Sequence, residues 1–94
     1  MRILCSHTTS QFEEDFILLP KKIQAKAKRK IWLFENNTFH SGLDTHKLKG
    51  VISNFWSFSI DEDYRVIFRV LPNQETMYYR IGLHKIYNEL ERLF

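Results

Sequence analysis

The sequence has only one cysteine, Cys5, among its 94 residues. A single thiol excludes an intrachain disulfide, and a reducing cytoplasm is the expected environment. One cysteine and four scattered histidines also give none of the paired ligand spacings that mark zinc sites. We therefore expect a metal-independent mechanism without a cofactor.

Long apolar runs are missing as well. No segment approaches the roughly 20 apolar residues that a membrane-spanning helix needs, and the N-terminus has no apolar run of signal-peptide length. The sequence also has no repeat, low-complexity tract or linker. These absences favour a single domain over residues 1–94, located in the cytoplasm and not in a membrane.

The residues that are present predict a packed, basic domain. Hydrophobic residues make up 44% of the chain and aromatic residues 15%, which is too apolar for a disordered protein. The net charge is +3 and the pI about 9.1, values that favour an anionic partner. Residues 21–50 hold most of the positive charge, with eight basic residues against two acidic ones.

The first half of the chain reads as a strand followed by two helices. Residues 2–7 resemble a short strand, and Ser10 with Glu13 has the form of a capping box that starts a helix. Pro20 interrupts this helix and suits the first turn of the next one. Apolar residues recur at helical spacing on both sides of the proline, which predicts an αα-hairpin with one apolar face that ends near Glu35. The segment 36–50 is polar and loop-like.

The second half alternates with a period of two residues. Segments 56–60, 64–70 and 77–83 are rich in β-branched and aromatic residues and are separated by turn sequences, which is typical of an antiparallel meander. A short helix over about 88–94 closes the chain. We predict an α+β fold of two layers in the order β-α-α-β-β-β, with the helix hairpin packed on an antiparallel sheet.

Alternation along these strands gathers cationic side chains on the sheet face away from the helices. That face is predicted to carry Arg65, Arg69, Arg80 and His84, with Tyr78 among them and Tyr87 just beyond. A guanidinium presents a planar fork of donors that matches a phosphate. Histidine exchanges protons near neutral pH. The combination suits cleavage of an RNA phosphodiester, with a tyrosine available to stack on a base.

Each of these residues also has a purely structural interpretation. The arginines could pair with the acidic turn 61–63, and His84 could be a hydrogen-bonded structural histidine. Lys26, Arg29 and Lys30 would by default form a solvated helix face, with RNA binding as the alternative. Residues expected in the core are Trp32, Phe34, Trp56, Phe58 and, as a small apolar side chain, Cys5.

Four segments in register resemble the RelE/ParE toxin superfamily. They are the loop 46–50 (HKLKG), the strand 55–60 (FWSFSI), the strand 63–68 (DYRVIF) and the ending 81–84 (IGLH) followed by Tyr87. The segment 19–23 (LPKKI) is similar to the helix junction of the same family. The resemblance spans nearly the whole chain and implies a RelE-like fold. It also implies a type II toxin–antitoxin module with a cognate antitoxin, and metal-free mRNA cleavage on the ribosome.

The resemblance also assigns roles to individual residues. Arg65 corresponds to the residue that stabilises the scissile phosphate, and His84 is the candidate acid or base. Lys47 and Lys49 match the basic loop, where they would bind phosphate or lower a proton affinity, and Tyr87 matches the terminal tyrosine. Residues expected to bind RNA around them are His46, Arg69, Arg80, Lys26, Arg29 and Lys30.

Three functions remain open on the sequence alone. The first is a ribosome-dependent endoribonuclease, which the combination of His46, Arg65 and His84 favours. The second is a ParE-like toxin that inhibits DNA gyrase without catalysis. That branch shares the fold, but it generally lacks the full set of acid and base residues. The third is a non-enzymatic interaction protein or a decayed toxin.

Overall fold

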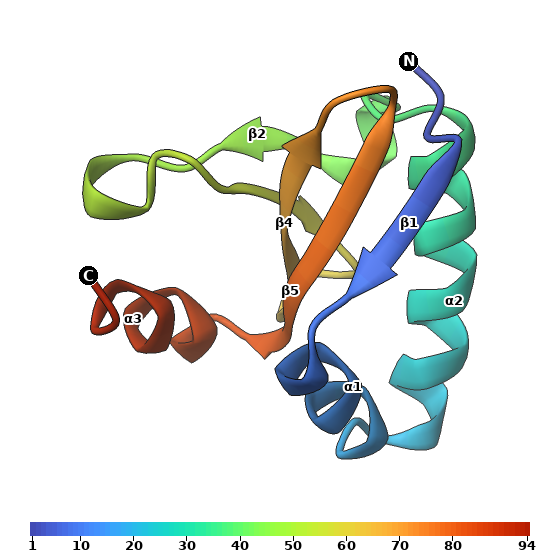
Figure 1. The fold of residues 1–94 in the computed structure, drawn as a ribbon. Helices are drawn as coiled ribbons and strands as arrows, with labels where there is room; N and C mark the ends of the chain where they lie inside the picture. Colours follow the sequence, from blue (N-terminus) through green and yellow to red (C-terminus); the bar gives the residue numbers. More distant parts are fainter.

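The computed structural model describes residues 1–94 and confirms the α+β architecture (Figure 1). Its helices are α1 (Ser10–Ile17), α2 (Lys21–Asn36) and α3 (Lys85–Glu91), with short 3₁₀ turns at Ser41–Leu43 and Gly50–Ile52. Its strands are β1 (Cys5–Thr8), β2 (His46–Lys47), β3 (Trp56–Ser59), β4 (Tyr64–Leu71) and β5 (Glu75–Leu83). None of the helices combines the length and apolarity required to span a membrane.

The five strands form one mixed sheet in the order β1-β5-β4-β3-β2. Strands β3 to β5 pair antiparallel as predicted, and β2, which was not predicted, pairs antiparallel with β3. β1 instead pairs parallel to β5, with Cys5 opposite Glu75 and Thr8 opposite Tyr78. The prediction of a wholly antiparallel sheet was therefore incomplete. The α1–α2 hairpin follows β1 in the sequence. β1 itself lies at the edge of the sheet beside β5, the last strand (Figure 1).

The predicted start of α1 is wrong by one residue. The N-cap is Thr9, whose hydroxyl accepts a hydrogen bond from the Phe12 amide at 3.0 Å, so Ser10 is the first helical residue. The Glu13 carboxylate accepts from the Thr8 hydroxyl at 3.0 Å and does not close a box with Ser10. Thr9 also donates to the Tyr79 carbonyl, and this tie to β5 selects it over its neighbour.

The main core lies between the helix hairpin and one face of the sheet. Phe34 of α2 is fully buried, and its ring centroid lies 4.4 Å from that of Phe58 and 4.6 Å from that of Phe68. Ala27 of α2 belongs to the same core, and its small side chain lets the helix approach the sheet closely. The predicted alternation of β3 and β4 is confirmed, because Phe58, Val66 and Phe68 all face the hairpin.

A second, smaller core covers the other face of the sheet. It contains Ile52, Phe55, Ile67, Ile86 and Leu90, so α3 and the segment before β3 pack here. In Figure 1 α3 and the β2–β3 connection lie on the side of the sheet away from the hairpin. The C-terminal helix is therefore confirmed, although it begins at Lys85 instead of Asn88.

Two residues assigned to the core are exposed, and a third, Trp56, is only half-buried. Trp32 lies on α2 but is 67% exposed, because its position points away from the stripe that contains Phe34. Cys5 is also exposed, since β1 is an edge strand. The segment 36–50, predicted as a loop, contains the first 3₁₀ turn and the two-residue strand β2.

Candidate active site

A β-bulge in β5 decides which side chains face away from the hairpin. Ile67 pairs with Arg80, but Phe68 pairs with Tyr78, so Tyr79 is the extra residue. The shift turns Tyr78 toward the hairpin, where its hydroxyl donates to the Glu35 carboxylate and burial raises its pKa far above the ordinary value. The prediction that Tyr78 lies beside the arginines was wrong, and Tyr79 occupies that face in its place.

Arg65 lies on the face away from the hairpin, directly opposite Gly82 of β5. It is half-buried, and its Nη1 donates to the backbone carbonyls of Asp61 and Tyr64, the latter at 3.1 Å. Both acceptors are neutral carbonyls. The guanidinium is thus held in place by the β3–β4 turn while its charge is not neutralised by a bound carboxylate.

Tyr87, from the first turn of α3, reaches across to β3. Its hydroxyl forms a 2.7 Å hydrogen bond with the hydroxyl of the fully buried Ser57. Burial raises the pKa of Tyr87, an effect that the Ser57 hydrogen bond and the positive charge of Arg65 oppose and that the charge of Asp44 reinforces. The net shift is upward, so the phenol stays protonated at neutral pH.

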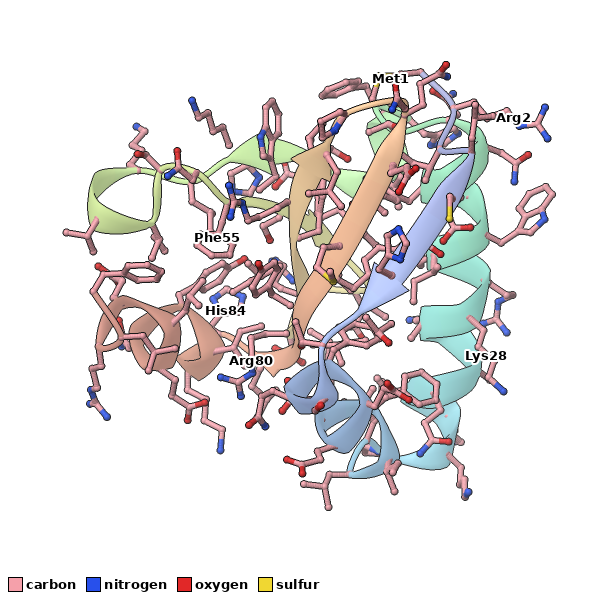
Figure 2. The ribbon with its side chains drawn as sticks, in the orientation of Figure 1. Met1, Arg2, Lys28, Phe55, Arg80 and His84 are labelled. Carbon is pink, nitrogen blue, oxygen red and sulfur yellow. The ribbon has the colours of Figure 1, made fainter.

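Two histidines flank this tyrosine. The His84 ring packs edge-on against the Tyr87 ring with centroids 5.8 Å apart, and the residue is exposed at the start of α3. His46 of β2 pairs with Ser57, which places it on the same sheet face as Arg65, and its Nδ1 lies 2.7 Å from the Asp44 carbonyl. Figure 2 shows His84 at the junction of β5 and α3, beneath Phe55.

The structure does not bring both loop lysines into this cluster. Lys47 pairs with Trp56, whose ring packs on the hairpin side of the sheet, so register places Lys47 on the face opposite Arg65. Lys49 lies just beyond β2, where it precedes the 3₁₀ turn and is exposed. The basic loop therefore offers His46 to the cluster, whereas its register turns Lys47 to the opposite face.

Arg80 and Arg69 are engaged by other partners. Arg80 donates to the Asp15 carboxylate at 2.7 and 3.2 Å and to Glu89 at 2.9 Å, which ties β5 to α1 and α3. The Asp15 hydrogen bond raises the pKa of Arg80, although burial lowers it. The Arg69 guanidinium lies 5.8 Å from the centroid of the Phe55 ring. Neither arginine contacts the Arg65–Tyr87 cluster, and the ion pairs of Arg80 account for its presence.

The basic residues of α2 lie on the other layer of the molecule. Lys26 alone among them contacts the turn that holds Arg65, because its Nζ lies 3.8 Å from the Asp61 carboxylate. Arg29 is exposed and Lys30 half-buried on the same helix. Lys28, which neighbours them, points away from the sheet in Figure 2. Apart from Lys26, the basic side chains of α2 form a surface separate from Arg65, as a solvated helix face would.

The turn beneath Arg65 gives a test of its own. The Asp61 carboxylate accepts from the amides of Asp63 and Tyr64, both at 2.9 Å. Burial acts to raise its pKa, but these two hydrogen bonds and the charges of Lys26 and Arg65 lower it below the ordinary 3.8. A lowered pKa means that the stabilisation is present above about pH 4 and is lost as the pH falls through the folded-state value.

We therefore expect Asp61→Asn, which keeps an acceptor oxygen but loses the charge, to reduce the free energy of unfolding at pH 7. The difference from wild type should stay constant down to about pH 5 and shrink below pH 4. Urea unfolding across that range measures it. A difference that grows toward low pH would contradict this account of the turn.

Sequence reasoning missed Ser57 as a site residue. It lies between Trp56 and Phe58, two residues whose side chains face the hairpin, so alternation already puts it on the face of Arg65. A small hydroxyl at a buried sheet position was the available signal. Tyr87 was predicted as a site residue, but its contact with Ser57 was not, because that contact depends on the angle at which α3 leaves β5.

No protein-family model matches the chain, and no curated protein sequence matches it. Solved structures do. The YoeB/ParE toxin from Agrobacterium tumefaciens superposes with a TM-score of 0.73 at 19% identity, over 89% of this chain and 99% of that one. A chain of the DinJ–YafQ toxin–antitoxin complex from E. coli gives 0.70 at 22% identity, over 86% and 92%.

An archaeal structure agrees with these two. A chain of the RelB–RelE antitoxin–toxin complex from Methanococcus jannaschii gives a TM-score of 0.69 at 20% identity, over 89% of this chain and 96% of that one. In each case the similarity covers most of both chains. The chain has the RelE/ParE toxin fold, as the sequence motifs predicted.

Proposed function

We propose that this chain, which has the RelE/ParE toxin fold, is the toxin of a type II toxin–antitoxin system and an endoribonuclease that cleaves mRNA on the ribosome. The fold supports the toxin role, because its solved neighbours include toxins and toxin–antitoxin complexes. The nuclease activity rests on the side chains described above. We assign it to the cytoplasm, where its proposed target lies.

The reaction has three chemical requirements. The RNA 2′-oxygen attacks the adjacent phosphorus and loses its proton, the bond from phosphorus to the 5′-oxygen breaks, and that oxygen gains a proton. The products are a 2′,3′-cyclic phosphate and a 5′-hydroxyl end. Between them the phosphoryl oxygens carry extra negative charge, which fixed donors must stabilise.

Side chains of this chain suit each requirement. Arg65 would donate to the phosphoryl oxygens, since its charge has no carboxylate partner. His84 is exposed beside Tyr87 and would transfer a proton, the role that imidazoles most often take. Tyr87 stays protonated, so it would donate a hydrogen bond to the phosphate or to the departing oxygen.

One observation carries the proposal. Arg65, Tyr87 and Ser57 converge from β4, α3 and β3 on a single sheet face, with His84 and His46 on either side. A purely structural arginine on this sheet is exemplified by Arg80, which is saturated by two carboxylates. Arg65 differs because the backbone fixes its position and leaves its charge available.

The test uses the purified protein with ribosomes and a defined mRNA. Primer extension should map discrete cuts in the ribosome-bound message, and the upstream fragments should end in 2′,3′-cyclic phosphates. An mRNA with a 2′-deoxy nucleotide at the cleavage position should resist cutting there, since the nucleophile is gone. Cutting that survives the 2′-deoxy substitution would refute this mechanism.

A cognate antitoxin is the second part of the proposal. The outer side of the hairpin exposes Ile17, Leu18 and Trp32, and the hollow at Trp32 is bordered by Lys28 and Arg29. An amphipathic segment with acidic residues would match both features. Adding such an antitoxin to the cleavage reaction should abolish cutting of the message.

A further inference from the structure

Three potential metal ligands meet at the β1 edge of the sheet. Cys5 and His7 are two residues apart on β1 and so project from the same side, and Glu75 is the β5 partner of Cys5. The His7 Nε2 lies 2.8 Å from the Glu75 Oε1 and 3.8 Å from the Cys5 Sγ. All three donor atoms lie within 4.8 Å of one another.

These separations are close to those of a metal coordination sphere. With typical bond lengths, a tetrahedral Zn²⁺ ion holds neighbouring S, N and O ligands about 3.3–3.6 Å apart. The two distances bracket that range and the third pair lies within 4.8 Å, so movements of about an ångström in exposed side chains would bring all three onto one ion. An ion pair between His7 and Glu75 explains two of these residues, but it does not need a thiol within reach of the same imidazole nitrogen.

We propose that Cys5, His7 and Glu75 form a Zn²⁺-binding site on the edge of the sheet, with a water molecule as the fourth ligand. Thiolate, imidazole and carboxylate are the three ligand types that Zn²⁺ takes in proteins. The thiolate and imidazole select against Mg²⁺ and Ca²⁺, which prefer oxygen ligands. The site is exposed, so an ion has direct access from solvent.

This site is separate from the candidate active site. It lies on β1, one edge of the sheet, whereas His46 lies on β2 at the opposite edge. Its effect would be mechanical, because an ion held by both strands fastens the N-terminal strand to β5. Zn²⁺ bound in this way stabilises the folded state over the unfolded chain by mass action.

The first experiment titrates the purified chain with Zn²⁺ by calorimetry. We expect one ion per chain, and a melting temperature higher by roughly 10–20 °C when free Zn²⁺ exceeds the Kd a hundredfold. Cys5→Ser, His7→Gln and Glu75→Gln should each weaken binding at least tenfold, since even loss of an outer partner of a ligand typically costs 10–100-fold. Glu14→Gln, an exposed carboxylate on α1, is the matched control and should bind as wild type.

Two further measurements report on the site itself. Co²⁺ in place of Zn²⁺ should give the intense visible bands of a tetrahedral ion and a thiolate charge-transfer band, both lost in Cys5→Ser. Zn²⁺ should also slow modification of Cys5, the only thiol, by a thiol reagent. Binding that is unchanged in the three ligand variants, one ion shared by two chains, or a thiol that stays equally reactive would overturn the proposal.

Because this inference does not depend on the proposed nuclease function, the two fail separately. Arg65→Ala should bind Zn²⁺ as tightly as wild type. Cleavage of mRNA that is normal while Zn²⁺ does not bind would reject the metal site alone.

Discussion

Arg65→Ala is expected to lower the rate of mRNA cleavage by about 10²–10³-fold, the usual cost of removing one fixed donor that stabilises transition-state charge. The guanidinium is pre-oriented by the Asp61 and Tyr64 carbonyls and forms no ion pair with a carboxylate. The free-energy cost of orienting the guanidinium is therefore met when the protein folds and not during the reaction. Single-turnover cleavage on programmed ribosomes measures the loss.

The matched control is Arg92→Ala, an exposed arginine just after α3, which should cleave at close to the wild-type rate. Thermal unfolding of both variants separates loss of chemistry from loss of fold. Growth arrest that persists in Arg65→Ala while the cellular mRNA stays intact would refute the nuclease assignment. DNA-damage signalling in the same cells would then indicate gyrase as the target.

Phe34→Ala should cause the largest loss of stability, about 3–5 kcal/mol in the free energy of unfolding. The ring is fully buried and packs against both the Phe58 and Phe68 rings, so its removal leaves a cavity in the main core. Domains of this size are stable by about 5–15 kcal/mol in total. The variant should therefore unfold at a much lower urea concentration than wild type.

Trp32→Ala is the control for this substitution, because it removes an even larger ring from the same helix. The Trp32 side chain is 67% exposed, and exposed substitutions usually change stability by about 0.5 kcal/mol or less. Equal losses in the two variants would show that α2 is not anchored through the face that carries Phe34.

The order and type of the elements were predictable because each half of the chain has one clear period. Apolar spacing of three and four residues marks α2, and alternation marks β4, where Val66 and Phe68 are buried on one face. Arg65 could be placed for the same reason. It follows Tyr64 and precedes Val66, so its face is fixed as soon as theirs is known.

The features that could not be predicted all depend on contacts between distant segments. Alternation breaks at the bulge in β5, and nothing local marks Tyr79 as the extra residue, so the face of Tyr78 was assigned wrongly. The exposure of Cys5 follows from its edge position, which becomes known only when β1 is paired with β5. The side of Lys47 depends likewise on its register against Trp56.

The parallel pairing of β1 with β5 has a consequence for synthesis of the protein. Residues 5–8 emerge first during translation, yet their only strand partner is residues 75–78, close to the end of the chain. Pairings so distant in sequence slow folding, and they cannot begin before the later segment exists. Tyr87 and His84 arrive later still. The edge of the sheet therefore closes only after residues 75–78 have been made, and a nascent chain that has not reached residue 84 lacks two of the proposed catalytic side chains.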